Sequence, residues 1–264
     1  MTARFELYRR LVGARIRAQW QYRTSLAIDA TGAFLLTFID FVVIVALFEH
    51  FKRLAGWNLD EVAFIYGVAG LGFALCDLVV GHIENMGDEI RSGHFDTMLL
   101  RPAGTLLQVV ASDFALRRVG KLLQASGILI YAMIRLPIQW TVVKAVLLVG
   151  SIGGGAAIFA TIFILGASLQ FAVMGTAEVA NAFTYGGSQF TSYPLDIYGP
   201  WLKRIFAYAI PLGFVAYFPS QYIIGKGNAP LWVQLSGPIV ATVALIVAVS
   251  VWTFAVRHYR STGS

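Results

Sequence analysis

Long apolar segments alternate with short polar ones along the chain. Three runs hold no charged residue, at 145–177, 205–225 and 227–256. Each reaches or exceeds the ~20 residues that cross ~30 Å of hydrocarbon as a helix. Because the runs are continuous instead of alternating, they indicate helices and not the strands of a membrane barrel. The pattern predicts an all-α polytopic membrane protein.

The boundaries of these segments predict six transmembrane helices. The first two are separated by a charged loop at 49–61, and a tight connection with Pro137 and Trp140 follows the third. In the fourth, a Gly150 to Gly154 spacing permits close helix contact. Five spans follow directly from the pattern: 26–48, 62–80, 119–134, 145–170 and 231–256.

The position of the remaining span, the fifth, is open. Hydropathy alone favours 205–225 and leaves 178–200 as a polar cytoplasmic loop. That run contains Pro211 and Pro219, however, and 179–195 is also free of charge. Two short membrane segments are therefore an alternative.

The N-terminal residues 3–24 predict an interfacial helix. One face carries apolar side chains and the other carries Arg10 and Arg17, an arrangement that suits the cytoplasmic leaflet. The alternative is an ordinary basic tail. The apolar face consists of Phe5, Tyr8, Val12 and Ile16.

Composition and charge support this class of protein. The chain is 58% hydrophobic and only 13% charged, with a net charge of +6. The N-terminal segment, the loop at 81–121 and the C-terminal tail hold 6, 5 and 2 of the 20 basic residues, together 13. Since basic loops resist translocation, all three are predicted to be cytoplasmic, as are both termini. This bias explains the positive charge without a nucleic-acid partner.

Motifs for soluble chemistry are missing from the sequence. Gly120-Lys121 and Gly225-Lys226 lack the surroundings of a phosphate-binding loop, and the four histidines show no metal-ligand spacing. We therefore expect no catalytic, cofactor-binding or metal residues on this chain, which is not an enzyme by itself. The lone Cys76 has no intrachain partner, and no cleavable signal peptide is expected.

Three acids lie at membrane depth. Asp40 is about eight residues from the outer end of the first span, ~12 Å inside, where an ionised carboxylate costs several kcal/mol unless it faces protein or water. Its role as a pathway residue or as an interhelical hydrogen-bonding acid is open. For Asp29 and Asp77, near the inner ends of the first two spans, a helix cap or an interhelical hydrogen bond is favoured.

The inner loop after the second span carries an amphipathic segment. Ile83, Met86 and Ile90 recur at helical spacing, and Phe95 follows a turn at Ser92-Gly93. An exposed apolar stripe among charges predicts the contact surface for a soluble partner protein.

The order of several motifs resembles the type-2 ABC exporter permeases. Residues 90–102 read IRSGHFDTMLLRP, similar to the family's inner loop, and Tyr193-Pro194-Leu195, Pro200-Trp201-Leu202 and Pro211-Leu212 resemble its outer segment. The resemblance covers nearly the whole chain, from the amphipathic N-terminal helix to the proline-containing segment before the last span. It is nearest to a six-span subgroup whose genes often specify two related permeases and one ATPase.

The resemblance implies a single permease domain over 1–264 in the bacterial inner membrane. It places the fifth span at 177–191 and makes 200–225 an outer re-entrant hairpin, with Lys203 and Arg204 outside. Within 81–118 it implies a coupling region that contacts separate ATPase subunits, which bind ATP and Mg. The predicted coupling residues are Ile83, Met86, Ile90, Gly93, Phe95 and Arg101.

It also implies a second permease copy, as a homodimer or a related heterodimer, with the substrate path between the two. The polar residues of 179–192 would be costly facing lipid, so we expect them at this interface or path, together with two from the first span. The set is Thr37, Asp40, Asn181, Thr184, Tyr185 and Ser188. The alternative function is a secondary ion-coupled transporter with Asp40 as the coupling acid.

Overall fold

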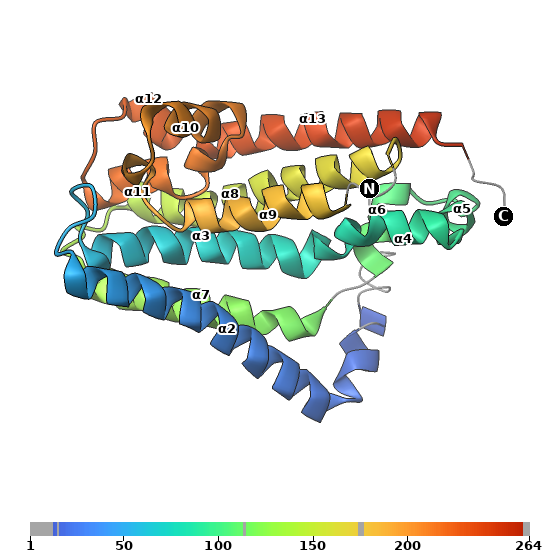
Figure 1. Cartoon of the computed structure of the whole chain (residues 1–264), viewed down its shortest axis with the longest axis horizontal. Helices are drawn as coiled ribbons and strands as arrows, with labels where there is room; N and C mark the ends of the chain where they lie inside the picture. Colours follow the sequence, from blue (N-terminus) through green and yellow to red (C-terminus); the bar gives the residue numbers. More distant parts are fainter. Residues whose placement is uncertain (1–12, 15, 113–114, 174–176, 261–264) are drawn as a thin grey trace.

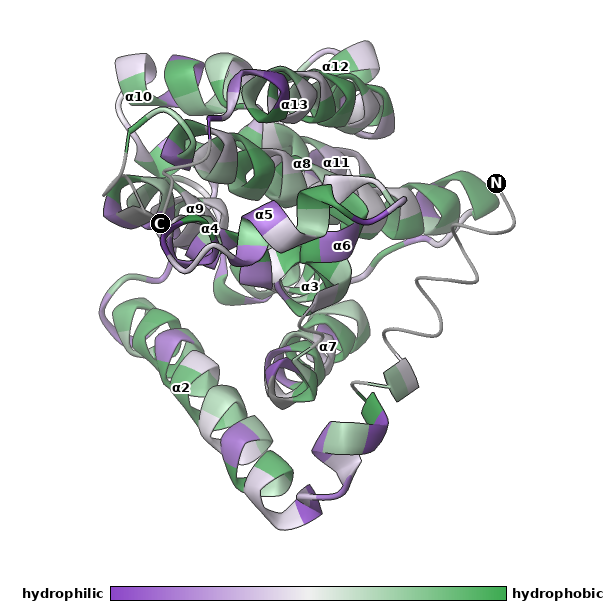
Figure 2. Cartoon of the chain, turned by 90° about the vertical axis from the view of Figure 1, so that its right-hand side faces the viewer, coloured by the Kyte–Doolittle hydropathy of each residue, from purple (hydrophilic) through white to green (hydrophobic). Residues whose placement is uncertain are grey.

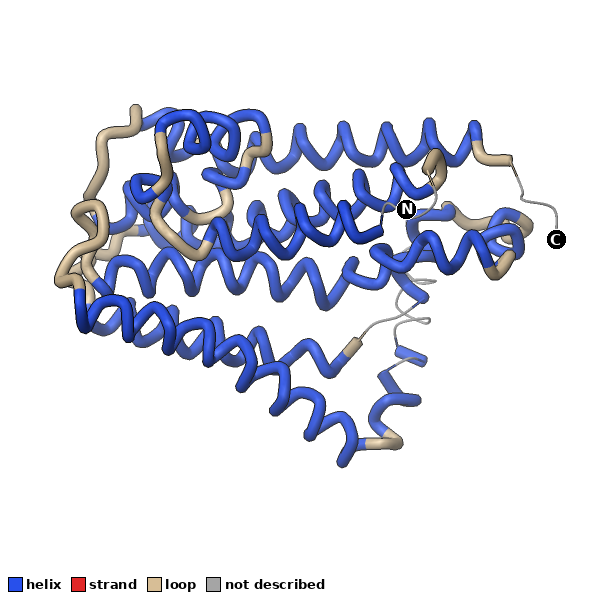
Figure 3. Tube along the Cα trace, viewed as in Figure 1, coloured by secondary structure: helices blue, strands red, loops and turns tan. Residues whose placement is uncertain are grey.

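The computed structural model describes residues 13–14, 16–112, 115–173 and 177–260, and this part of the chain forms helices and no strand. Figures 1 and 3 show the longer helices side by side along one axis, with shorter ones at both ends. Half of the predicted interfacial helix at 3–24, residues 3–12 and 15, lies outside the described residues, and 16–20 are helical. The helices are α2 (Arg23–His50), α3 (Leu59–Val80), α4 (Met86–Arg91), α5 (His94–Leu99), α6 (Thr105–Ser112), α7 (Val119–Arg135), α8 (Val142–Gln170), α9 (Ala177–Thr191), α10 (Pro200–Arg204), α11 (Tyr217–Ile224), α12 (Leu231–Leu235) and α13 (Gly237–His258).

Four helical stretches of the described chain are long and apolar enough to cross a membrane: Arg23–His50, Leu59–Arg91, Val142–Gln170 and Gly237–His258. The second of these is α3 together with the short helices that follow it. The all-α membrane class is confirmed. The helices α7 and α9, with 17 and 15 residues, are shorter than the ~20 of a typical span. Six spans therefore stay a prediction.

Polar side chains set the starts of two long helices. Asn58 accepts a hydrogen bond from the backbone N–H of Glu61, and the Glu61 carboxylate accepts one from the N–H of Asn58, which completes a capping box. At the start of α8, the Thr141 hydroxyl accepts from the N–H of Lys144.

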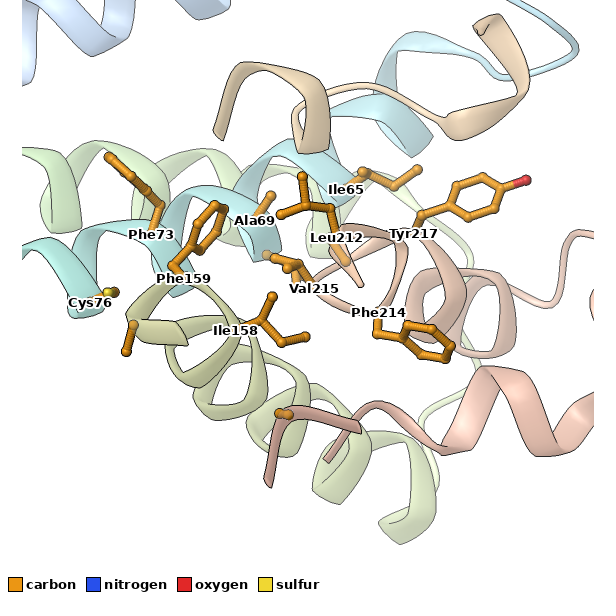
Figure 4. Packing of buried hydrophobic residues seen from close by; sticks show 14 of the residues in the cluster. Ile65, Ala69, Phe73, Cys76, Ile158, Phe159, Leu212, Phe214, Val215 and Tyr217 are labelled. Carbon is orange, nitrogen blue, oxygen red and sulfur yellow. The ribbon is translucent and has the colours of Figure 1, made fainter. Parts of the chain in front are cut away.

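The centre of the protein is formed by α3 and α8. Phe73 of α3 packs edge-on against Phe159 of α8, with ring centroids 5.1 Å apart, and Val215 lies beside them (Figure 4). A side chain in place of Gly155 would meet Val215 at 3.1 Å. These buried residues belong to one hydrophobic core that reaches α11 and α13.

Gly150 and Gly154 lie on the face of α8 that packs against α13. A Cβ at Gly154 would lie 3.6 Å from Ala241, and one at Gly150 would lie 3.5 Å from Pro238, which are ordinary van der Waals distances. The Gly150 to Gly154 spacing therefore marks a contact between the two helices, at which a methyl group would also fit.

The helices α2 and α13 lie at the periphery. Only 11% of the apolar part of α2 and 17% of that of α13 is buried, against 72% for the stretch that contains α3. Figure 2 shows both ribbons mostly in the hydrophobic colour. Such surfaces need lipid or another protein around them.

The segment after α9 is broken where hydropathy alone favours the fifth span. Residues 205–225 do not form one continuous helix, because they divide into η4 (Ile205–Ala209), η5 (Leu212–Phe214) and α11. The break lies at Pro211, whose nitrogen has no hydrogen to donate. A helix instead occupies Ala177–Thr191, the position that the family resemblance implies.

Short helices occupy the two ends of the bundle. α10, α11 and α12 gather at one end, and α4, α5 and α6 at the other (Figure 1). The predicted last span is interrupted near Ser236, between α12 and α13.

We predict that Gly67 is required for the packing of α3 on α7. Its Cβ position lies 2.8 Å from the Cα of Leu129, so Gly67→Ala forces the two backbones apart. We expect a loss of about 1–3 kcal/mol in the free energy of unfolding, typical of overpacking. Thermal unfolding of the purified protein in detergent measures it.

Gly127→Ala is the matched control, because its Cβ would meet nothing within 4 Å. Equal melting temperatures for the two variants would contradict this account of the packing.

Candidate functional site

A polar cleft of about 280 Å³ lies between α2, α3, α7 and α9. Apolar helices pack well against lipid, so a gathering of polar side chains at this depth needs a specific reason. Its lining residues are Leu36, Thr37, Asp40, Tyr66, Ala69, Gly70, Phe73, Lys121, Gln124, Tyr185, Ser188, Gln189 and Ser192.

Hydrogen bonds to one carbonyl hold three helices together in the cleft. The hydroxyl of Tyr66 on α3 donates to the Thr37 carbonyl of α2 at 3.0 Å. The amide of Gln124 on α7 donates to the same carbonyl at 3.2 Å and to the Tyr66 hydroxyl at 3.3 Å. These bonds fix α2 to the bundle where its apolar packing is slight.

Asp40 faces α9 across the cleft. Its side chain is exposed, and the Gln189 amide lies 3.5 Å from the carboxylate. Among the described residues, no cation lies within ion-pair distance of Asp40. An exposed carboxylate on a lipid-facing helix is costly, which calls for water or protein next to it.

Lys121 lies at the boundary between the cleft and a buried ion cluster. Its ammonium donates to the Asp77 carboxylate at 2.9 Å and lies 5.5 Å from the ring centre of Phe73 and 5.9 Å from that of Tyr185. The two rings offer their faces to the cation and lower the cost of its partial burial.

Asp77 has no exposed side-chain surface and two cationic neighbours. The second is Arg118, which approaches the carboxylate at 3.2 Å and donates to the Asp77 carbonyl at 2.5 Å. The predicted cap or interhelical hydrogen bond is thus a buried ion cluster. Such a cluster is tolerated when each charge is matched.

The ion cluster continues through Glu84 into the segment after α3, residues 81–102, which we call the inner segment. Arg118 lies 3.7 Å from the Glu84 carboxylate, which also accepts a hydrogen bond from the Tyr185 hydroxyl at 3.0 Å. The side chain of Gln170, at the end of α8, binds the same segment. It accepts a hydrogen bond from the N–H of Gly87 and donates one to the Glu84 carbonyl. Helices α8 and α9 are thereby tied to the residues just after α3.

The structure brings four of the six predicted path residues together. Thr37, Asp40, Tyr185 and Ser188 all line the cleft. Thr184 is only 1% exposed and donates to the Ala180 carbonyl, and Asn181 is half-buried, so these two lie apart from the lining.

Sequence reasoning missed Lys121, Gln124 and Tyr66 as cleft residues. The first two are three positions apart on α7, a spacing that places both on one helix face, and this signal could have found them. Tyr66 is an isolated polar residue in an apolar helix, and no pattern in the sequence marked it.

The predicted apolar stripe of the inner loop is buried, not exposed. Ile83, Met86, Ile90 and Phe95 are at most 2% exposed within the chain's own core. The Phe95 ring lies 5.0 Å from that of Phe171, with Trp252 and Tyr259 close by. The premise of an exposed stripe was wrong, because α4 and α5 fold back onto the ends of α8 and α13.

Other residues of this loop do face outward. Leu100 is 87% exposed and Leu99 42%, and Arg101 is also exposed. Gly93, half-buried, takes a positive φ of 70° at the turn between α4 and α5, which favours glycine. The described residues include no group of His, Cys, Asp and Glu that could hold a metal ion.

We predict that Lys121→Met destabilises the protein by about 3 kcal/mol, since it leaves the buried Asp77 carboxylate short of one cation. Denaturant or thermal unfolding in detergent gives the value. Replacing both residues, as Asp77→Leu with Lys121→Met, should restore part of it.

Lys52→Met, at an exposed loop position, is the control. A Lys121→Met variant as stable as this control would refute the role of the ion pair.

Comparison with known proteins identifies the family to which the chain belongs. A family model described as ABC-2 family transporter protein matches residues 34–263, and no curated protein or solved structure matches the chain. The matched region includes the cleft, the ion cluster and the inner segment. With its apolar helices and a match over most of its length, the chain belongs to the ABC-2 transporter family and is a multi-pass membrane permease of ABC transporters.

Proposed function

We propose that this chain is one of two permease subunits of an ATP-driven exporter, and that the polar cleft faces the second permease across the substrate path. The observation that carries the proposal is Asp40, an exposed carboxylate in the largely apolar middle of α2. Lipid cannot solvate it, whereas a water-lined path or a partner's polar surface can.

The exposure of side chains near Asp40 supports the same side of the bundle as the surface that faces the second permease. Gln189 and Tyr185 on α9 are exposed beside Asp40, so three polar groups from two helices share one side of the bundle. Without a hydrophobic driving force, helices in a membrane associate through such polar and small side chains.

ATP binding and hydrolysis would act on this cleft only indirectly, through a separate ATPase subunit. We infer that the inner segment at 81–102 contacts that ATPase through Leu99, Leu100 and Arg101, while Ile83, Met86, Ile90 and Phe95 anchor the segment to the bundle. Glu84 supports this view, since it joins the inner segment to Arg118 and Tyr185. A displacement of the segment would therefore bear directly on the cleft.

Energy from ATP would act by changing the populations of two states. A ligand shifts an equilibrium only by its differential affinity for the two states, so ATP must favour one arrangement of the ATPase pair. Membership of the ABC-2 family favours this mechanism over the ion-coupled carrier, in which Asp40 alone would couple transport.

We predict that two permease copies crosslink through α9. In a Cys76→Ala background, Gln189→Cys should form a disulfide between subunits in native membranes, because its side chain is exposed at the cleft. Non-reducing electrophoresis detects the product at twice the mass.

Ile246→Cys is the comparison position, with 61% exposure on α13, away from the cleft. Crosslinking at residue 246 but not at residue 189 would place the second permease on the other side.

We predict that Leu100→Asp weakens ATPase binding. An isolated leucine that is 87% exposed loses little stability on substitution, but at an interface a buried charge costs about tenfold or more in affinity. Copurification of the ATPase subunit and ATP-dependent transport both report the effect.

Arg260→Asp serves as its control, because Arg260 is exposed and follows Tyr259, whose ring packs against Phe95, but lies outside 81–102. If Leu100→Asp retains the ATPase stoichiometry and the transport rate of this control, the contact is elsewhere.

A further inference from the structure

A second and larger hollow lies at the end of the bundle opposite α4, α5 and α6. It has a volume of about 820 Å³, within the range of small-molecule sites. The loop after α2, the helices α10 and α11, and the loop before α12 form its walls. Its lining residues are Ala55, Trp57, Asp196, Pro200, Lys203, Arg204, Ala207, Tyr208, Tyr217, Phe218, Gln221, Lys226, Gly227, Asn228, Ala229 and Pro230.

The two lysines of this pocket are already matched by acids. Lys203 donates to Asp196 at 2.6 Å, and Lys226 donates to Glu61 at 2.5 Å and to the Gly56 carbonyl at 2.8 Å. Each lysine is therefore paired with a carboxylate, and neither supplies the pocket with a free charge.

Asp196 is the anchor of this arrangement. Partial burial opposes its ionisation, but hydrogen bonds from Lys203, Tyr217 and Trp57 prevail and hold the pKa of its carboxyl below the usual value. With three hydrogen-bond donors bound, the Asp196 carboxylate stays ionised at neutral pH. Its hydrogen-bonding capacity is used by residues of the protein itself.

Arg204 carries the surplus charge of the pocket. It is exposed, lines the hollow, and has no acid within ion-pair distance in the described part of the chain. A guanidinium offers paired N–H donors in the geometry that phosphoryl and carboxylate groups accept.

The floor of the pocket is aromatic. Trp57 and Tyr217 are 2% and 4% exposed, with ring centroids 6.0 Å apart. Lys226 lies 4.9 Å from the Trp57 ring centre, and Tyr208 is exposed at the rim. Such surfaces suit the carbon skeleton of a polar ligand.

Gln221 provides an acceptor without a partner. The residue is 3% exposed, lines the pocket, and its Oε1 accepts no hydrogen bond from any described residue. Gly227, with φ of 113°, packs so closely that a Cβ there would lie 2.3 Å from the Gln221 side chain. The amide is thus fixed in place, and an unpaired buried acceptor of this kind favours a ligand with a hydroxyl or amine donor.

We infer that this pocket binds an anionic group that carries hydroxyls, the chemistry of a glycerophosphoryl lipid headgroup. The phosphoryl oxygens accept from Arg204, a hydroxyl donates to Gln221, and the glycerol carbons lie on the aromatic floor. Trp201 and Trp232, 73% and 71% exposed at this end, are typical of residues at the headgroup layer. The inference concerns the permease alone and does not depend on an ATPase partner.

Binding to the purified full-length chain in detergent tests it. Dioctanoyl-phosphatidylglycerol should raise the melting temperature in a saturable manner, and dioctanoyl-phosphatidylcholine, with the same chains, should not. Arg204→Gln should weaken the apparent affinity about tenfold or more, as expected for loss of a charge-assisted contact.

Arg135→Gln is the matched control, because Arg135 lies at the same end of the bundle, outside the pocket, and pairs with Asp60. Gln221→Met provides a second variant, which should also weaken binding. Soluble glycerol 1-phosphate distinguishes the source of the ligand: competition at millimolar concentration indicates a free solute, and its absence indicates the lipid.

Competition by glycerol 1-phosphate and its absence both support the proposed binding site. Equal stabilisation by the two lipids, or equal affinity for phosphatidylglycerol in Arg204→Gln and Arg135→Gln, would overturn the proposal.

Discussion

A carboxylate with no exposed surface governs the arrangement of the half of this protein that carries α4, α5 and α6. Asp77 is tolerable there only while cations surround it, and both of its partners lie just before or within α7. That requirement fixes α7 beside α3, and through Arg118 it also fixes the segment that carries Glu84. Apolar packing alone allows helices to slide along or rotate against each other, whereas an ion cluster has one geometry. The polar cleft is therefore positioned by electrostatics as much as by the core.

The sequence predicted the fold class well because a lipid environment leaves a strong signal. Continuous apolar runs located α2, α3, α8 and α13, since every backbone polar group in hydrocarbon must be satisfied within a helix. Hydropathy failed at 205–225, because an apolar segment buried in protein and one that spans lipid have the same composition. The proline at 211 and the resemblance to known permeases carried the information that hydropathy lacked.

The residues of the candidate site were harder to predict from the sequence than the fold class. Thr37, Asp40, Tyr185 and Ser188 were found because polar residues in apolar segments are conspicuous. The pairing of Asp77 with Lys121, 44 positions apart, was not found, because charge complementarity at that separation follows from tertiary structure. The helical spacing of Ile83, Met86 and Ile90 was identified correctly, but periodicity does not tell whether that face meets its own bundle or a partner.

The modest length of α7 and α9 has a consequence for the surrounding bilayer. At 1.5 Å per residue, their 17 and 15 residues extend only ~26 and ~22 Å, less than the ~30 Å of a typical hydrocarbon layer. If α7 and α9 cross the bilayer, as predicted, lipid next to them has to compress, while lipid next to the longer α8 and α13 does not. Compression costs a fraction of a kcal/mol per Å, and covering the short helices with another helix bundle would remove that cost. The bilayer itself would then exert a lateral force toward association on the side where the cleft opens.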